Sequence, residues 1–263
     1  MDASFQQVLV ALASGSLIGC TLGLIGGGGS ILATPLLMYA VGMRDAHMAI
    51  GTGALGVSVN AYLNLAGHAA KGHVWWRCAL IFAIAGAIGA FLGSSFGKLV
   101  DGQRLLFMFG LLMMFVSFAM RKTKGGSDVS AQSLTMLTHC KTTIIALLTG
   151  FGAGFFGIGG GFLIVPALLL ATGMPLINAI GTSLLAVGTF GLTTAINYAA
   201  SGLVDWKIAI YFILGGLTGG IVGTIAATKL ADRKNLLAQI FRWIVFCVSL
   251  YVLWRSYGSF NRA

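Results

Sequence analysis

The chain has 263 residues, of which 57% are hydrophobic and only 8% charged, and its formal net charge is +10. A soluble domain carries about a quarter charged residues, so this composition excludes a water-soluble fold and predicts an all-α integral membrane protein. The basic residues gather beside apolar segments, which is typical of membrane topology and contact with lipid headgroups, so we expect membrane lipids and no nucleic acid as partners. The four cysteines form no CxxC pair, and we expect no metal and no cofactor.

Ten apolar segments follow one another along the chain. They lie at about 5–25, 30–43, 48–70, 75–97, 103–121, 140–157, 161–174, 177–200, 207–229 and 236–255. Most of them reach the ~20 residues that a helix needs to cross the hydrocarbon core. The segments at 30–43 and 161–174 are shorter, and each follows a glycine cluster. We expect both to be Gly-broken half-helices or re-entrant segments that line a cavity.

The stretch at 122–139 is polar and basic, and it predicts a cytoplasmic linker between two membrane repeats, 1–121 and 140–263. Ala49-Ile50-Gly51-Thr52 in the first half is matched by Ala179-Ile180-Gly181-Thr182 in the second, which indicates an internal duplication. Each repeat then has four to five helices. Five spans in each half would make the halves inverted and four would make them parallel, and the sequence leaves both arrangements open.

The two glycine clusters are the first candidates for a binding site. Glycines before a helix leave several backbone N–H groups without a partner, and with the positive helix end these groups favour an anion. The predicted substrate-binding residues are Gly26, Gly27, Gly28, Gly29 and Ser30 in one cluster and Gly157, Gly159, Gly160 and Gly161 in the other. Pro35 and Pro166, which end the clusters, are predicted helix breaks. The alternative is a tight turn that only allows close packing.

Polar side chains at helical spacing are the second candidates. Asn60, Asn64 and His68 share one helix face, and Thr193, Asn197 and Ser201 repeat the pattern 133 residues later. Substrate binding is predicted for Asn60, Asn64, Asn197, Thr52, Thr182 and Ser183, and proton coupling for His68. Hydrogen bonding between helices is the alternative for all of them. Glycines spaced by four residues, at 15–23 and 215–223, predict close helix packing.

Leu24 to Pro35, Phe156 to Pro166 and the two Ala-Ile-Gly-Thr elements resemble the sulfite exporter TauE/SafE family, also called the toluene sulfonate uptake permease family. The resemblance covers nearly the whole chain. It implies about eight spans from a duplicated unit and a multi-pass carrier of sulfur-containing anions in the bacterial inner membrane.

The predicted function is therefore secondary transport of a small sulfur-containing anion, such as sulfite or a sulfonate, by alternating access. A passive anion channel is an alternative. An intramembrane enzyme is a weaker one, because the chain has no HExxH motif and no acidic residue inside a segment. The direction of transport, coupling to protons or another ion, and a homo-oligomer stay open.

Overall fold

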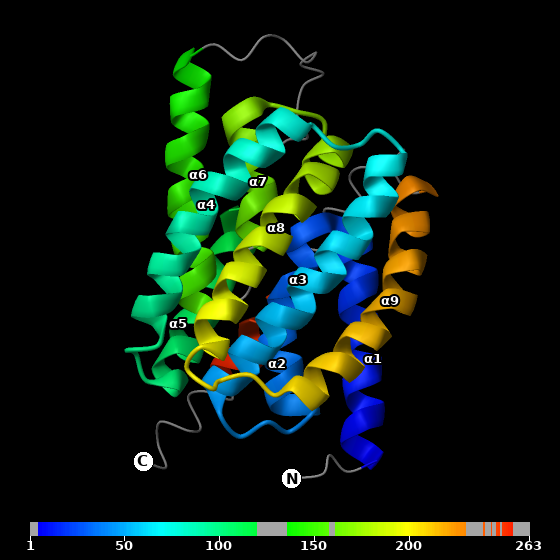
Figure 1. The fold of residues 1–263 in the computed structure, drawn as a ribbon, viewed down its shortest axis with the longest axis vertical. Coiled ribbons are helices and arrows are strands. Elements are labelled where there is room, and N and C mark those ends of the chain that lie inside the picture. The colour runs from blue at the N-terminus through cyan, green and yellow to red at the C-terminus, as the bar shows by residue number, and fades with distance from the viewer. Residues whose placement is uncertain are drawn as a thin grey trace.

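The computed structural model describes residues 5–119, 136–157 and 161–229, together with some residues between 239 and 254. These residues are helical and contain no strand, which confirms the all-α prediction. The elements are α1 Phe5–Ile25, η1 Gly26–Leu32, α2 Ala33–Pro35, η2 Leu36–Ala40, α3 Ala46–Ala70, α4 Trp76–Gly97, α5 Gly102–Ala119, α6 Met136–Phe156, α7 Gly161–Thr172, α8 Leu176–Ala199 and α9 Trp206–Lys229 (Figure 1). Most of the predicted linker lies outside the described residues.

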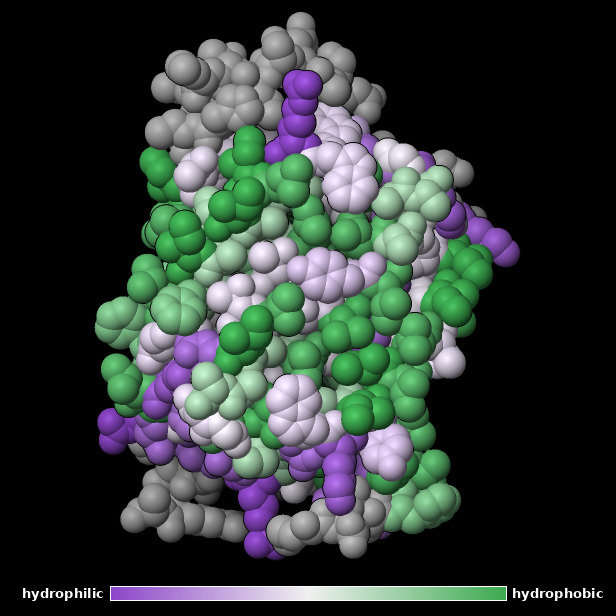
Figure 2. Space-filling view, viewed as in Figure 1, coloured by the Kyte–Doolittle hydropathy of each residue, from purple (hydrophilic) through white to green (hydrophobic). Residues whose placement is uncertain are grey.

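Four of these helices are long and apolar enough to cross a membrane by length and composition: α1, α4, α8 and α9. Large apolar side chains on their outer faces are exposed, among them Ile84 of α4 and Ile221 of α9. Figure 2 shows this apolar surface as a broad green band with purple residues toward the two ends. An exposed apolar belt of this kind is expected where lipid takes the place of water.

The glycine stripes of α1 and α9 bring their backbones into contact. A Cβ on Gly15 would collide with the carbonyl of Phe212, and one on Gly23 would lie 2.8 Å from the carbonyl oxygen of Gly220. From Gly15 to Gly23 of α1 the contacted residue of α9 moves from Phe212 to Gly220, so the two helices run in the same direction. Small residues permit this close approach, as the sequence predicts. Helices α4 and α6 are also parallel and meet through the same kind of glycine contacts.

Helices α3 and α8 cross in opposite directions at the centre of the molecule (Figure 1). Gly51 of α3 packs against Tyr198, whereas further along α3 Ser58 donates a hydrogen bond of 2.7 Å to the carbonyl oxygen of Gly188. Because α8 and α9 form a hairpin and α9 is parallel to α1, α1 and α3 point the same way. The short segment between them therefore returns the chain to the end where α1 began. Helix α4 runs opposite to α3 and is parallel to α6, and α8 also runs opposite to α3, so α6 and α8 point the same way. Helix α7, which connects them, therefore runs in the opposite direction.

The first short segment is an irregular helix. It begins with the tight turns of η1 at Gly26 and widens into π-helical turns in η2, directly after Pro35. Proline has no N–H to donate, and here the bonding pattern changes at Pro35, with Val41 N–H donating to Leu36 O at 3.0 Å. Pro166, in contrast, lies inside α7, which continues through it. The prediction that Pro166 breaks the helix is therefore wrong, and α6 ends before it, next to the left-handed Gly157.

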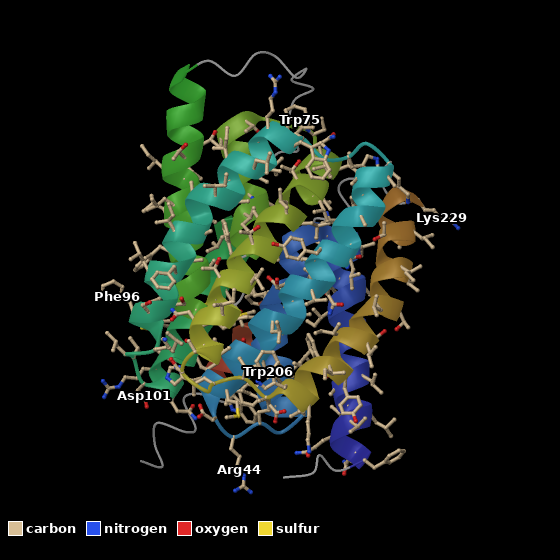
Figure 3. The ribbon with its side chains drawn as sticks, in the orientation of Figure 1. Arg44, Trp75, Phe96, Asp101, Trp206 and Lys229 are labelled. Carbon is tan, nitrogen blue, oxygen red and sulfur yellow. The ribbon has the colours of Figure 1, made fainter. Side chains whose placement is uncertain are left out.

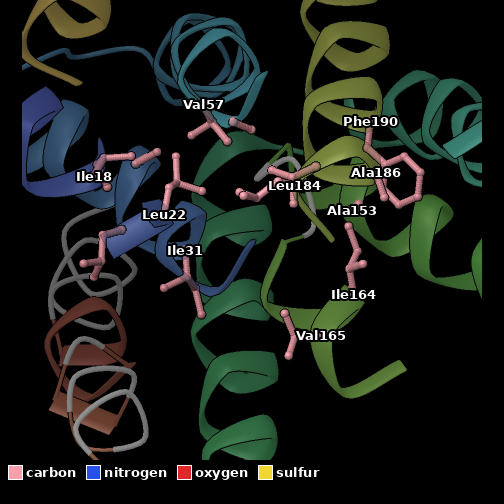
Figure 4. Packing of buried hydrophobic residues seen from close by; sticks show 14 of the residues in the cluster. Ile18, Leu22, Ile31, Val57, Ala153, Ile164, Val165, Leu184, Ala186 and Phe190 are labelled. Carbon is pink, nitrogen blue, oxygen red and sulfur yellow. The ribbon is translucent and has the colours of Figure 1, made fainter. Parts of the chain in front are cut away.

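Buried aliphatic side chains hold the two short segments among the long helices. Figure 4 shows Ile18 and Leu22 of α1, Ile31 of η1, Ile164 of α7 and Leu184 of α8, each without exposed surface. Burial of a side chain of this size stabilises a fold in water by about 1.5–3 kcal/mol, and inside a membrane the tight packing itself supplies the contact energy. The core thus joins both interrupted segments into one packed unit.

Candidate functional site

The first glycine break lies against the beginning of α8. Gly26 has φ +69°, which only glycine adopts without strain, and a Cβ there would lie 2.8 Å from Ser183 Oγ and 3.0 Å from the carbonyl oxygen of Ile180. The Gly27 N–H donates to Ser183 Oγ at 3.3 Å, while the Ser183 hydroxyl donates to Ile180 O at 2.8 Å. Ser30 Oγ donates to Gly27 O at 2.8 Å and closes the turn. Ser183 is thus placed beside the glycine cluster.

The second glycine break begins beside α3. Gly157 has φ +65°, and a Cβ there would collide with Cγ2 of Ile50. Ile50 and Ile180 belong to the two Ala-Ile-Gly-Thr elements. Each break therefore lies against the Ala-Ile-Gly-Thr element of the other half of the chain. Gly159 and Gly160 lie outside the described residues, and Gly161 begins α7.

The first break meets the helix that follows the second one, because α7 packs against η1. Gly26, Gly27, Gly29 and Ser30 are buried, and a Cβ on Gly29 would lie 2.5 Å from Thr21 Oγ1 of α1. Gly28 lies within the same turn. The structure thus brings the predicted glycine residues of the first cluster next to α7, in a conformation that covers them. An anion reaches these amides only if the packing around η1 opens.

Thr52 and Thr182 hold the loops that precede α9 and α4. Thr52 Oγ1 accepts a hydrogen bond of 2.9 Å from the backbone N–H of Asp205, and Thr182 Oγ1 accepts one of 3.0 Å from that of Trp75. Figure 3 shows Trp75 at the end of the molecule opposite to Trp206, the residue after Asp205. Both threonines are fully buried. The structure therefore gives these hydroxyls a role in fixing the two hairpins rather than an orientation toward the glycine breaks.

Asn60 and Asn64 face the glycine stripe of α9. The side chain of Asn60 packs against Gly216, is fully buried and has no hydrogen-bond partner at its amide among the described residues. Asn64 donates to the Asn60 carbonyl oxygen at 2.8 Å and accepts from Thr224 Oγ1 at 3.0 Å. Asn64 also lines an apolar groove of about 260 Å³ between α3 and α9. Both side chains thus belong to the α3–α9 contact, and Asn64 also lies beside Gly23 of α1.

Asn197 lies in a different polar cluster, where α8 ends beside the end of α4. Its amide nitrogen donates to Ser94 Oγ at 2.6 Å and to Ser95 Oγ at 3.0 Å. Lys98 Nζ donates to Asn197 Oδ1 at 2.9 Å, to Asn197 O at 3.1 Å and to Ser201 Oγ at 2.9 Å. A cation at a helix C-terminus is favoured by the helix dipole. The structure therefore does not bring Asn197 to the glycine breaks, and its contacts match the alternative of hydrogen bonding between helices.

His68 lies at the end of α3, where its side chain is fully buried and its Nε2 is 3.0 Å from the carbonyl oxygen of Gly23. His73, in the turn that follows, has its ring centroid 5.8 Å from that of His68. The sequence pattern did not predict that His73 lies beside His68. The signal available in the sequence is Gly72 between the two histidines, which predicts a helix-ending turn that folds back. Among the described residues no group of three or more His, Cys, Asp or Glu side chains could hold a metal ion.

The chain is similar in sequence to known proteins. A family model described as "Sulfite exporter TauE/SafE" matches residues 11–252. A "Probable membrane transporter protein" of Xylella fastidiosa is 59% identical over 257 residues, which cover 97% of this chain and 98% of the relative. The "Probable membrane transporter protein YunE" of Bacillus subtilis is 26% identical over 96% of this chain and 98% of its own length. No solved structure matches.

Proposed function

Because the chain belongs to the sulfite exporter TauE/SafE family of membrane transporters, we propose that it is a secondary carrier of a small sulfur-containing oxyanion, such as sulfite or a sulfonate. The family and the relatives' names indicate a membrane transporter rather than an enzyme. We place the carrier in the bacterial inner membrane as a multi-pass protein. Its partners are the anion and the surrounding lipids.

The observation that carries this proposal is the meeting of η1 and α7, the two segments that follow the glycine breaks. The first amides of α7, from Gly161 onward, have no partner within their own helix, and those of η1 follow a left-handed glycine. Backbone N–H groups at a helix start attract an anion without a charged side chain. A neutral site of this kind binds an oxyanion and also lets it leave, which a carrier requires.

Ser183 is the side chain best placed to complete this site. Its Oγ lies 3.3 Å from the Gly27 nitrogen, and its hydroxyl donates to the Ile180 carbonyl in the closed conformation. When an anion arrives, the same hydroxyl is able to rotate and donate to it, because a serine O–H turns freely about its C–O bond. We assign binding of the anion to the amides of both breaks and to Ser183.

Alternating access is supported by reciprocal contacts between the two halves of the chain. Helix α1 packs against α9 and α6 packs against α4, while α3 crosses α8 in the opposite direction. Ser58 bonds to Gly188, the residue 130 positions later, as expected near the two-fold axis of an inverted repeat. In transporters built from inverted repeats, broken helices form the site and one part rocks against the other. Rocking would uncover η1, which is buried in this conformation.

Flux into proteoliposomes tests the proposal. Purified protein is reconstituted, loaded with unlabelled anion and given labelled sulfite, taurine or sulfoacetate outside. A carrier exchanges the labelled anion against the internal one, so internal substrate accelerates uptake. A passive channel gives uptake that rises linearly with concentration and is not accelerated in this way. Absence of flux for all three labelled compounds, with folded protein, would refute the proposal.

A further inference from the structure

The turn after α3 places two imidazole rings side by side. The His73 N–H donates to the His68 carbonyl oxygen at 3.1 Å, the Gly72 N–H donates to the Ala69 carbonyl oxygen at 3.0 Å, and Gly72 has φ +71°. This is the bonding of a Schellman turn, in which a left-handed glycine folds the chain back over the last helical turn. His73 is thereby returned onto His68, and the ring centroids lie 5.8 Å apart.

The hydrogen bond of His68 fixes where a proton can be added. A carbonyl oxygen only accepts, so Nε2 of His68 carries the hydrogen that is donated to Gly23 O at 3.0 Å. Nδ1 of neutral His68 is therefore an acceptor, and it is buried with no hydrogen-bond partner among the described residues. Nδ1 of His73 is likewise buried without a partner. The pair thus holds two ring nitrogens without a hydrogen-bond partner among the described residues, and that of His68 is free to take up a proton.

Burial and a neighbouring charge disfavour a permanently bound proton on His73. The titratable groups that act on His68 are His73 and Lys71, while α1 contributes the neutral carbonyl of Gly23. From α9, Thr224 bonds to Asn64, one helical turn before His68. Burial, and then the Lys71 charge, lower the pKa of His73, which lies in the turn outside the helices. A proton taken up here is released again readily, as a coupling site requires.

The end of α8 shows that the turn itself does not need histidine. There Leu203 N–H donates to the Tyr198 carbonyl oxygen at 3.0 Å, and Gly202 has φ +72°. The backbone bonding is the same, but Tyr198 and Leu203 occupy the places of His68 and His73. The two turns therefore share their backbone bonding, whereas the pair of imidazole rings is present only in the turn after α3.

His68 is linked to the first glycine break through α1. Its bond partner Gly23 lies in the last turn of α1, three residues before the left-handed Gly26. A protonated imidazole donates a stronger, charge-assisted hydrogen bond than a neutral one. Addition of a proton to Nδ1 therefore strengthens the hold of α3 on the end of α1 directly beside η1.

We propose that His68 and His73 form a proton-binding site that couples proton movement to anion transport. A proton passes from water to His73 and then to Nδ1 of His68, which becomes the imidazolium while His73 returns to its neutral form. The proton leaves by the reverse steps or through the opened conformation. This inference rests on the proposed carrier function. It adds the coupling ion and a site separate from the glycine breaks.

The test separates exchange from proton-driven accumulation. Proteoliposomes are given labelled sulfoacetate, a probe that stays ionised near neutral pH, with the membrane potential held at zero. One proton moved with each anion gives about tenfold accumulation for a gradient of one pH unit, because one pH unit corresponds to about 1.4 kcal/mol. Exchange between internal and external anion at equal pH needs no net proton movement.

The variants are His68→Gln, which keeps an N–H donor for the Gly23 carbonyl, and His73→Gln. We expect both to retain at least half of the wild-type exchange and to lose the tenfold accumulation. His47→Gln is the matched control at the other end of α3, because His47 Nε2 also donates to a carbonyl, that of Val100 at 3.1 Å. Its ring neighbour is Tyr198, with centroids 6.1 Å apart. We expect His47→Gln to accumulate the anion like the wild type.

Tenfold accumulation by His68→Gln or His73→Gln would overturn the proton site, and so would its loss in His47→Gln. If His68→Gln does not fold, the accumulation measured with His73→Gln, a substitution in the turn, tests the proton site by itself. Wild-type exchange without accumulation under the pH gradient would refute the proton site and leave the carrier intact. Absence of wild-type exchange for every anion tested would instead refute the carrier function.

Discussion

Replacement of Gly26 by alanine probes the first break most sharply, because the same substitution at Gly42 provides a matched control. Both glycines have positive φ, +69° and +82°. A non-glycine residue in this conformation costs about 1–2 kcal/mol at either position. The surroundings differ: a Cβ at Gly26 would lie 2.8 Å from Ser183 Oγ and 3.0 Å from Ile180 O, whereas nothing lies within 4 Å at Gly42.

The added contact at Gly26 costs about a further 1–3 kcal/mol, because the break has to move away from α8. This shift pulls the Gly27 N–H away from Ser183 and displaces the amides that we assign to the anion. We expect Gly26→Ala to lower exchange at least tenfold and to lower the unfolding midpoint in detergent more than Gly42→Ala does. Gly42→Ala should exchange within twofold of the wild type. Equal exchange by the two variants would refute the argument that the packed break forms the site.

Three further predictions concern residues outside the glycine breaks. Thr52→Val and Thr182→Val each leave a partly buried backbone N–H without its acceptor, so each should lower the free energy of unfolding by about 1 kcal/mol, measured by denaturant titration. Asn197→Ala removes a partner of Lys98, so it should lower thermal stability and leave the half-saturating anion concentration of exchange unchanged. A large rise in that concentration would contradict our placement of Asn197 away from the glycine breaks. Because the pKa of His73 is lowered in the folded protein, the unfolded chain binds more protons, and stability should fall as pH drops below about 6.5, less steeply in His73→Gln.

The helices could be predicted because their ends are marked in the sequence. Charged residues and glycines interrupt the apolar runs, and α1, α4, α8 and α9 begin and end within two residues of the predicted segments. The direction of the short segments could not be predicted, since four or five spans per half fit the same apolar pattern. It follows from contacts between distant helices, such as Gly15 with Phe212 and Ser58 with Gly188.

The polar stripes show why site residues were harder to predict. Helical spacing places Asn60, Asn64 and Asn197 on faces but does not say which helix each face meets. In the structure Asn60 packs on Gly216 of α9, and Asn197 meets Ser94 and Ser95 of α4. The neighbours of these side chains depend on tertiary packing, which helical periodicity does not predict.

The most direct measurement is an experimental structure of the protein with a transported anion bound. Our account predicts density for the anion between η1 and the first turn of α7, within hydrogen-bonding distance of backbone N–H groups and of the Ser183 hydroxyl. Anion density in the groove between α3 and α9, with the two glycine breaks still packed and empty, would contradict the account.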